Sequence, residues 1–392
     1  MPRAPLVIEL PEPDPAARAH CARVVAALRE AIAGSGGSIA FARYMAIALY
    51  APGLGYYAAG AAKLGPGGDF VTAPEMTPLF GAALATQVAE ILDATRAREV
   101  VELGAGTGRL AADVLNALSA RGALPSRYAI LEPSPDLRER QRATLERAAR
   151  GHRDRIAWID ALPGAIDGAV IANEVLDAVP CAVVARRNGE YLERAVGWDA
   201  TREGFMWVDR PAPPRLAALA ARRFPGDGDY LSEINPAAEA LVEDVGGRLA
   251  GGAALWIDYG FPAGEYYHPQ RREGTLMCHY RHRAHDDPFA WPGLTDITAH
   301  VDFTAIAEAG ERAGLQVAGY AAQAPFLMGC GILAALAAVG APASVDYVRA
   351  AAAAQKLLAP SEMGELVKVL ALARSPAIRW PGFAVSNRAG RL

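Results

Sequence analysis

The spacing of apolar positions changes at about residue 78 of the chain. Before this point apolar residues recur every three or four positions, which predicts a helix over 20–33 and a second helix from Ser38 to Pro52-Gly53. After it, short apolar runs alternate with helical stretches, and this alternation is typical of a parallel sheet with helices on both faces. The predicted strands are residues 99–103, 127–132, 155–159, 168–172 and 252–258, and the predicted helices around them are residues 79–92, 110–118, 136–150 and 236–249.

Two segments interrupt this alternation and are predicted to be insertions. Residues of about 181–225 contain short strand-like runs that turn at Asn188-Gly189, a pair typical of a hairpin. Residues 260–300 are rich in proline and histidine and show no clear period. A helix over 303–313 is then predicted to return the chain to the sheet.

The end of the chain is predicted to add a last pair of strands, 315–322 and 366–374, around a helical insertion over 327–362. The stretch from Ala321 to Ala343 carries no charge, but it is mostly alanine and glycine and contains two prolines. Alanine supports membrane insertion weakly, so we expect a strand followed by a buried helix and no stable membrane insertion.

These patterns divide the chain into three parts. Residues 1–77 are expected to form N-terminal helices and a loop that covers a cofactor, residues 78–374 an α/β domain with the three insertions, and residues 375–392 a C-terminal tail. The net charge of −4 argues against a dedicated nucleic-acid partner. The sequence contains four cysteines without a C-x-x-C pair and no signal-peptide pattern, so we expect a reducing, cytoplasmic location.

Residues 100–110, VVELGAGTGRL, join a predicted strand to a predicted helix through Gly104, Gly106 and Gly108. Such glycines let the backbone turn sharply and let a ligand approach without Cβ contact. The dinucleotide fingerprint places its third glycine one residue later, where this chain has Arg109. A dehydrogenase and a plain tight turn remain the alternatives to a different nucleotide ligand.

Glu102 separates these alternatives. An acid beside the loop favours a ligand that carries an ammonium group and disfavours a diphosphate, because like charges repel at short range. S-adenosylmethionine has that ammonium and a ribose but no phosphate. Glu132, followed by Pro133, ends the next strand, and an acid at this position can accept hydrogen bonds from both ribose hydroxyls. Asp160 and Leu162 follow the third strand and are predicted to contact the adenine.

Several further motifs resemble the MidA family of bacterial and mitochondrial methyltransferases, whose mitochondrial members are assembly factors of respiratory complex I. The matching motifs span residues 38–303 in the family's order: SIAFARYMAIALYAPGLGYY, GDFVTAPEMTPLFG, VELGAGTGRL, LEPSPDLRERQ, IANEVLDAVP, YLSEINPAAE and DITAHVDFTAI. The resemblance implies a class I methyltransferase fold, a Rossmann-like seven-stranded sheet with an N-terminal helical extension and insertions. It also implies S-adenosyl-L-methionine as cofactor and methylation of an arginine on a partner protein.

IANEVLDAVP supplies the candidate catalytic residues Asn173, Glu174 and Asp177 at the end of the fourth strand, and Asn173 is also expected to bind the cofactor. A guanidinium is protonated at neutral pH, and carboxylates can orient it and accept its proton. Glu174 and Asp177 are expected to share a face if a helical turn forms there. The alternative is a capping arrangement at the start of a helix.

GDFVTAPEMTPLFG is expected to fold over the cofactor. Thr72 and Glu75 can hydrogen-bond the methionine end, and Pro74, Phe80 and Gly81 are predicted to shape the wall. The alternative is a rigid loop in which Thr77-Pro78 begins the next helix.

The segment ITAHVDF adds His300, which is expected to face the acceptor, and Asp302, which is expected to cap the next helix. CHYRHRAHDDP fits no zinc spacing, so no metal is expected and a loop that faces the substrate is favoured. Methylation of another nitrogen or oxygen and a catalytically inactive assembly factor that binds the cofactor remain alternative functions. A homodimer is compatible with the sequence.

Overall fold

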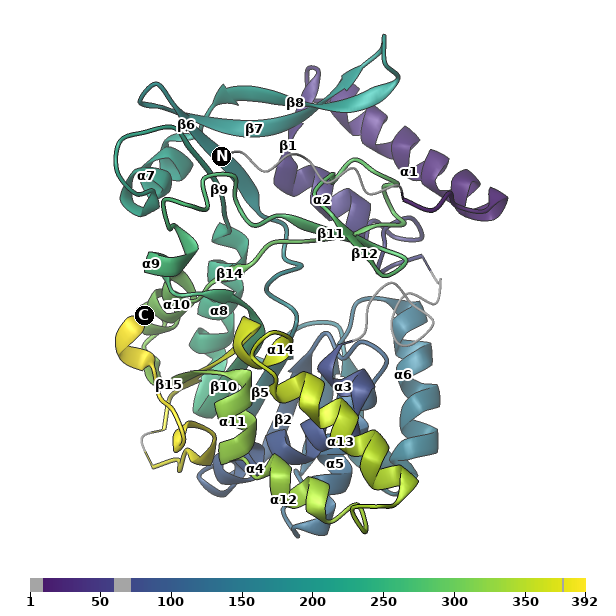
Figure 1. The fold of residues 1–392 in the computed structure, drawn as a ribbon, viewed down its shortest axis with the longest axis vertical. Coiled ribbons are helices and arrows are strands. Elements are labelled where there is room, and N and C mark those ends of the chain that lie inside the picture. The colour runs from purple at the N-terminus through teal and green to yellow at the C-terminus, as the bar shows by residue number, and fades with distance from the viewer. Residues whose placement is uncertain (1–9, 60–71, 376) are drawn as a thin grey trace. The chain divides into compact units, whose positions relative to one another are not determined.

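The computed structural model describes residues 10–59, 72–375 and 377–392, which form two compact units (Figure 1). The first unit contains the described residues of 1–70, 177–238 and 263–300, and the second contains those of 71–176, 239–262 and 301–392. The N-terminal part and two of the predicted insertions therefore belong to one unit. Residues 60–71, in the middle of the predicted cofactor-covering loop, lie outside the described residues.

The second unit is built on a sheet with the strand order β15-β16-β10-β5-β2-β3-β4. β10, β5, β2, β3 and β4 pair in parallel, whereas β15 and β16 pair antiparallel at one side. β14 also pairs with β10, so the sheet has eight strands where seven were predicted. The strands are β2 Glu99–Leu103, β3 Arg127–Leu131, β4 Ile156–Ile159, β5 Ile166–Asn173, β10 Leu249–Phe261, β14 Val301–Asp302, β15 Gln316–Ala322 and β16 Val367–Ala373.

Helices cover both faces of this sheet, as predicted. Gly310 of α10 lies so close to Leu372 of β16 that a Cβ would be 2.5 Å from that side chain. The neighbouring residue Ala371 points to the opposite face, where it shares a core cluster with Leu327 of α11. The helices are α3 Ala73–Met76, α4 Pro78–Asp93, α5 Arg109–Ala120, α6 Pro135–Ala148, α8 Pro236–Arg248, α10 Phe303–Arg312, α11 Gln323–Gly329, α12 Ile332–Ala337, α13 Val345–Leu358 and α14 Met363–Leu366, with short 3-10 turns η1 Arg150–Arg155, η2 Pro381–Phe383 and η3 Ala389–Arg391.

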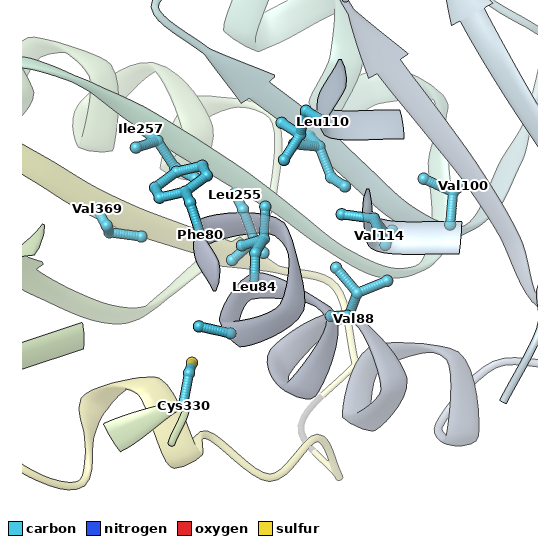
Figure 2. Packing of buried hydrophobic residues seen from close by; sticks show 14 of the residues in the cluster. Phe80, Leu84, Val88, Val100, Leu110, Val114, Leu255, Ile257, Cys330 and Val369 are labelled. Atoms are coloured by element: carbon cyan, nitrogen blue, oxygen red, sulfur yellow. The ribbon is translucent and has the colours of Figure 1, made fainter. Parts of the chain in front are cut away.

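The core of the second unit is packed between α4, α5 and the central strands. Figure 2 shows Phe80 beside Ile257 and Leu84 beside Leu255, so that α4 rests on β10. Val88 approaches Val114, which joins α4 to α5. All five of these aliphatic side chains and the Phe80 ring are at most 1% exposed, so this packing fixes the positions of the strand ends.

The first unit contains two antiparallel sheets, one with the order β1-β7-β6-β9 and β8 paired to β7, the other with the order β12-β11-β13. The hairpin at Asn188-Gly189 is confirmed, with φ 50° and 83° at the two residues. The insertion over 260–300, for which no period was found, contains short strands. The elements are α1 Pro15–Ala33, β1 Ser38–Ala40, α2 Phe41–Tyr50, β6 Ala182–Arg187, β7 Glu190–Asp199, β8 Gly204–Pro211, α7 Pro214–Arg223, β9 Tyr230–Ile234, α9 Ala263–Tyr266, β11 Met277–Tyr280, β12 Arg283–His285 and β13 Asp296–Thr298.

Two helix predictions near the N-terminus change at their first residues. α1 begins at Pro15, earlier than predicted, because Asp14 accepts a hydrogen bond from the Ala17 N–H and proline suits the first helical position. The helix predicted from Ser38 begins at Phe41, because Ser38–Ala40 pair with 195–197 of β7 as a strand. Pairing with a distant strand decides the conformation of these three residues.

The uncharged stretch from Ala321 to Ala343 contains the end of β15 followed by the largely buried α11, as predicted, and then by α12, in which only Ile332 is buried. Within the residues that the structure describes, no helix combines the length and the apolar character needed to cross a membrane. Asp302 caps α10 as expected, since its Oδ1 accepts a hydrogen bond from the Ala305 N–H at 3.2 Å.

Candidate functional site

The glycine loop between β2 and α5 has the backbone conformation that its glycines predict. Gly104, Gly106 and Gly108 have φ values of 61°, 53° and 84°, a region that favours glycine. The Gly104 N–H donates to the Leu131 carbonyl at 3.1 Å, which ties the loop to the end of β3. A Cβ on Gly108 would lie 3.1 Å from the Cα of Gln141 on α6, so this glycine also permits a close helix contact.

Glu102 is buried inside β2 beside this loop. It is 2% exposed, and its Oε2 accepts a hydrogen bond of 2.8 Å from the Tyr128 hydroxyl on β3. Burial raises the pKa of Glu102 to about 7, the nearby Glu132 charge adds to the rise, and the Tyr128 hydrogen bond opposes it. Its predicted contact with the ammonium of a ligand stays a prediction.

Glu132 follows β3 and carries a carboxylate that two donors orient. Its Oε1 accepts from the Ser134 N–H at 3.0 Å, and its Oε2 accepts from Nε2 of Gln141 at 3.1 Å. A carboxylate has about four acceptor positions, so two positions remain for ribose hydroxyls. Burial raises the pKa of Glu132, and the two hydrogen bonds and the Arg138 charge oppose that rise.

The other predicted contacts of the adenosine side lie on the loops after β3 and β4. Pro133 is exposed and precedes Ser134, the cap of α6. The Asp160 side chain is 91% exposed and pairs with Arg138 at 2.6 Å. Leu162 is half-exposed, and its carbonyl accepts from Arg248 at 3.4 Å. The predicted adenine contacts of Asp160 and Leu162 stay predictions.

The short helix α3 connects the segment before the sheet to the glycine loop. Thr72 precedes this helix without a side-chain cap, and Pro74 occupies its first turn. The Thr107 hydroxyl donates to Oε1 of Glu75, which places the Glu75 carboxylate beside the glycine loop. The alternative for the next residues is confirmed, because Thr77 caps α4 and Pro78 begins it.

Phe80 and Gly81 have packing contacts that account for their identity. Phe80 is 1% exposed and belongs to the core cluster of the second unit (Figure 2). A Cβ on Gly81 would lie 2.6 Å from the Cβ of Asp113, so the glycine lets α4 approach α5. The place of both residues in a cofactor wall stays a prediction.

Asn173 and Glu174 stand at the carboxyl end of β5. The Asn173 amide donates to Oε1 of Glu174 at 3.2 Å, and the Asn173 Oδ1 is buried without a hydrogen-bond partner among the described residues. Glu174 has φ 51°, and its N–H donates to the Ile257 carbonyl of β10 at 2.8 Å. A left-handed glutamate is a strained conformation of the kind that clusters at functional sites.

Asp258, which the sequence analysis did not single out, fixes the loop after Glu174. Its Oδ2 accepts from the N–H groups of Val175 and Leu176 at 3.1 and 2.8 Å, and its Oδ1 accepts from its neighbour Tyr259 at 2.8 Å. Asp258 ends the apolar run of β10, which pairs with β5, and that position was the available signal.

The expected relation between Glu174 and Asp177 needs correction. No helical turn forms over 174–177, because Glu174 is left-handed and Asp258 holds the next two N–H groups, so the capping alternative is also wrong. Asp177 and His300 belong to the first unit. There the Asp177 carbonyl accepts from the Ala299 N–H at 3.0 Å and the His300 N–H donates to the Thr275 hydroxyl at 3.1 Å.

The histidine-rich insertion shows no metal-binding arrangement in the part of the chain that the structure describes. Within that part, no group of three or more His, Cys, Asp and Glu side chains is placed to hold a metal ion. Cys278 and His285 face each other as a cross-strand pair of β11 and β12, and both are buried. Burial lowers the pKa of His285, although Asp286 and Asp287 oppose this effect.

The residues of the second unit fit S-adenosylmethionine and not a diphosphate. Glu132 offers acceptors for a ribose, and the buried Asn173 Oδ1 offers one more acceptor at the same edge of the sheet. Alternation along β2, β3 and β5 puts Glu102, Glu132 and Asn173 on one face. These three groups can accept hydrogen bonds from hydroxyl and ammonium donors, whereas a diphosphate brings no such donors and would be repelled by the Glu132 carboxylate.

The comparisons with known proteins agree with this arrangement. Residues 83–321 match the model of the family described as S-adenosyl-L-methionine-dependent methyltransferases. A methyl transferase candidate from Burkholderia thailandensis, solved with S-adenosyl-homocysteine bound, is 49% identical, with a TM-score of 0.94 over 98% of this chain and 100% of that one. A native structure from the same organism is 48% identical, with a TM-score of 0.91 and the same coverage.

Mitochondrial relatives are more distant in sequence. The mitochondrial protein arginine methyltransferase NDUFAF7 of Mus musculus is 32% identical over 305 residues, which cover 69% of this chain and 66% of the mouse protein. The human protein of that name is 31% identical, with 69% and 65% covered. The chain thus spans about two thirds of the length of these relatives. The predicted class I fold is confirmed, and the chain belongs to the family of S-adenosyl-L-methionine-dependent methyltransferases.

Proposed function

We propose that this protein transfers a methyl group from S-adenosylmethionine to an arginine side chain of a partner protein. The bound cofactor would supply an activated methyl group on sulfur. The chain then has to hold the acceptor nitrogen in line, exclude water and take up a proton. Relatives named protein arginine methyltransferases support arginine as the acceptor.

The pair Asn173–Glu174 is the observation that carries this proposal. A guanidinium has five N–H donors and no acceptor, so it requires acceptor atoms around it. The Glu174 carboxylate and the buried, unpartnered Asn173 Oδ1 provide such atoms side by side at the end of β5. Glu174 is the group that we expect to orient the guanidinium and to receive its proton.

In this proposal the glycine loop, Glu102 and Glu132 hold the cofactor, together with Thr72, Pro74, Glu75, Asp160 and Leu162. Phe80 and Gly81 are proposed to shape the wall of the cofactor site together with Pro74, and Pro133 and Asn173 are proposed to contact the cofactor. Asp177 and His300 remain predicted catalytic residues.

Two other functions give different results in the same experiment. Purified protein is incubated with cofactor that carries a labelled methyl group and with a cell lysate, and the labelled protein is hydrolysed to amino acids. We expect label in methylarginine. Label on another nitrogen or oxygen would support a different acceptor, and cofactor binding without any transfer would support an inactive assembly factor.

The location and the partners of the protein are part of the same proposal. The four cysteines are free thiols and buried, which supports a reducing, cytoplasmic compartment. A protein partner with an exposed arginine segment, of the kind found in respiratory complex I, fits the family resemblance. Light scattering tests the proposed homodimer, and a DNA titration tests the expected lack of nucleic-acid binding.

A further inference from the structure

Gln141 connects three parts of the cofactor site, and the proposed function has not used it. Its side chain lies on α6 and is fully buried, with 0% exposed. The Nε2 donates to the Gly106 carbonyl at 3.0 Å and to Oε2 of Glu132 at 3.1 Å. The Oε1 accepts from the Trp158 Nε1 on β4 at 2.8 Å.

The chemistry of these partners fixes the orientation of the Gln141 amide. An indole N–H can only donate and a backbone carbonyl can only accept, so Trp158 selects the amide oxygen and Gly106 selects the nitrogen. Both hydrogens on Nε2 are then used, one toward the glycine loop and one toward Glu132. If the amide were turned, its nitrogen would face the Trp158 N–H donor and its oxygen would face the Gly106 and Glu132 acceptors, so all three hydrogen bonds would be lost.

Glu132 depends on this arrangement. It is 4% exposed, and burial alone would favour its neutral form. The charged groups that act on it are Arg138, on α6, which stabilises the carboxylate, and Glu102, on β2, which repels it. Besides the Ser134 N–H, Gln141 provides the side-chain hydrogen bond to the carboxylate.

We propose that Gln141 is a positioning residue that holds the Glu132 carboxylate and the Gly106 carbonyl in one geometry for the ribose of the cofactor. The inference rests on the proposed binding of S-adenosylmethionine at this edge of the sheet. Gln141 acts through Glu132, so its contribution should depend on the charge of that carboxyl group. A residue that only fills space would contribute equally at every pH.

The test compares Gln141→Met, which keeps the volume of the side chain and removes its hydrogen bonds, with the unchanged protein. S-adenosylhomocysteine is titrated calorimetrically at a series of pH values, from mildly acidic to mildly alkaline, because burial raises the pKa of Glu132. We expect about tenfold weaker binding at neutral pH. As the pH is lowered, the variant should also begin to lose affinity at a higher pH than the unchanged protein does, because loss of the Gln141 donor lets the pKa of Glu132 rise further.

Gln141→Glu should reverse the pH dependence of S-adenosylhomocysteine binding. The introduced carboxyl group and Glu132 lie within hydrogen-bond distance and share one proton, so binding should weaken as the pH rises and recover as it falls. In a Glu132→Gln background, which has no carboxyl group to orient, Gln141→Met should reduce the affinity for S-adenosylhomocysteine much less than it does in the unchanged protein. Trp158→Phe keeps Gln141 and frees its amide to turn, so it should change affinity in the same direction by a smaller amount.

Unchanged affinity and an unchanged pH dependence in Gln141→Met would overturn the inference, and so would full additivity with Glu132→Gln. Circular dichroism monitors folding, and a variant that fails to fold is replaced by Trp158→Phe as the deciding protein. These titrations need no acceptor. A failure to methylate arginine would therefore refute the proposed acceptor and leave the role of Gln141 intact, whereas unchanged titrations would refute the role of Gln141 alone.

Discussion

The loops after β3 and β5 end at the same edge of one sheet, yet their polar atoms are used differently. After β3, the Glu132 carboxylate already has a donor on each oxygen. After β5, the Asn173 Oδ1 is buried without a partner among the described residues, and the adjacent Glu174 has a left-handed backbone. The proposed cofactor side is thus oriented within the chain, whereas the proposed acceptor side keeps an unmet hydrogen-bonding group and a strained residue.

This difference suggests how the two halves of the site divide their work. A preoriented carboxylate loses little freedom when the cofactor binds, which favours affinity. Strain and unmet hydrogen bonds cost about 1–3 kcal/mol each and persist where the surrounding structure enforces them. Asp258 enforces the loop after β5 through two backbone N–H groups. We therefore expect substitutions on the acceptor side to change turnover and substitutions on the cofactor side to change affinity.

The largest expected effect is that of Glu174→Gln. The amide keeps the size of the side chain but cannot take a proton from a guanidinium, so methyl transfer should fall by about a hundredfold or more. S-adenosylhomocysteine affinity should stay within about twofold, since general-base loss leaves binding of the cofactor untouched. Single-turnover transfer of labelled methyl and calorimetry measure the two quantities. A parallel loss of affinity for S-adenosylhomocysteine would contradict the expectation that the acceptor side affects turnover and the cofactor side affects binding.

Glu102→Gln should change how stability depends on pH. Glu102 in the folded chain has a pKa raised to about 7 by burial, so between its ordinary value and about 7 the folded chain keeps a proton that the unfolded chain has lost. Stability from this group is therefore lost as the pH rises through that window, by an upper limit on the order of 3 kcal/mol. Urea unfolding at about pH 5 and about pH 8 should show the variant gaining relative stability at the higher pH. An equal difference at both values would contradict the buried, protonated Glu102.

Asp258→Asn should destabilise the protein by about 2 kcal/mol, because an amide has one acceptor oxygen and its nitrogen must face either the two N–H groups of the loop or the Tyr259 N–H. Methyl transfer should fall by more than the loss of folded protein accounts for, because this loop holds the Glu174 backbone. Asp160→Asn is the matched control. Its side chain is 91% exposed, and its substitution should change stability by no more than about 0.5 kcal/mol. Equal effects in both variants, read by urea unfolding, would contradict the role of Asp258.

Two glycine substitutions should separate packing from binding, with the smallest expected effect on methyl transfer. Gly81→Ala places a Cβ against Asp113 and should cost about 1–3 kcal/mol of stability with little change in affinity for S-adenosylhomocysteine. Gly108 has φ 84° and lies close to Gln141, so Gly108→Ala should cost about 1–2 kcal/mol of stability and should also weaken binding of S-adenosylhomocysteine. A loss of affinity in Gly81→Ala would instead support its predicted place in the cofactor wall.

The sequence was sufficient for the elements with a clear period. The bounds of β2 were predicted to the residue, and the order of strands and helices around the glycine loop was correct, because alternation and the glycine pattern are local. Ser38–Ala40 were predicted as helix because their pairing with β7 is remote in sequence. The same limit hid the first unit, since its three segments are brought together only by folding.

The candidate site shows the same boundary between local and distant information. Acids at strand ends could be picked from the sequence, but their partners could not. Gln141 occupies an inward position four residues before Leu145 on α6, where a buried polar side chain indicates a specific partner. The periodicity could indicate that position, but only the packing of α6 against the loops identifies Gly106, Glu132 and Trp158 as its partners.

Calorimetric titration of the purified protein with S-adenosylhomocysteine, and separately with NADH, tests the central claim most directly. The acids at the strand ends and the position of Gly108 predict saturable binding of S-adenosylhomocysteine to one site for each chain. They also predict no heat from the dinucleotide, because its diphosphate has no hydrogen to donate to these acids and would be repelled by the Glu132 carboxylate. Saturable binding of NADH without binding of S-adenosylhomocysteine would contradict the account.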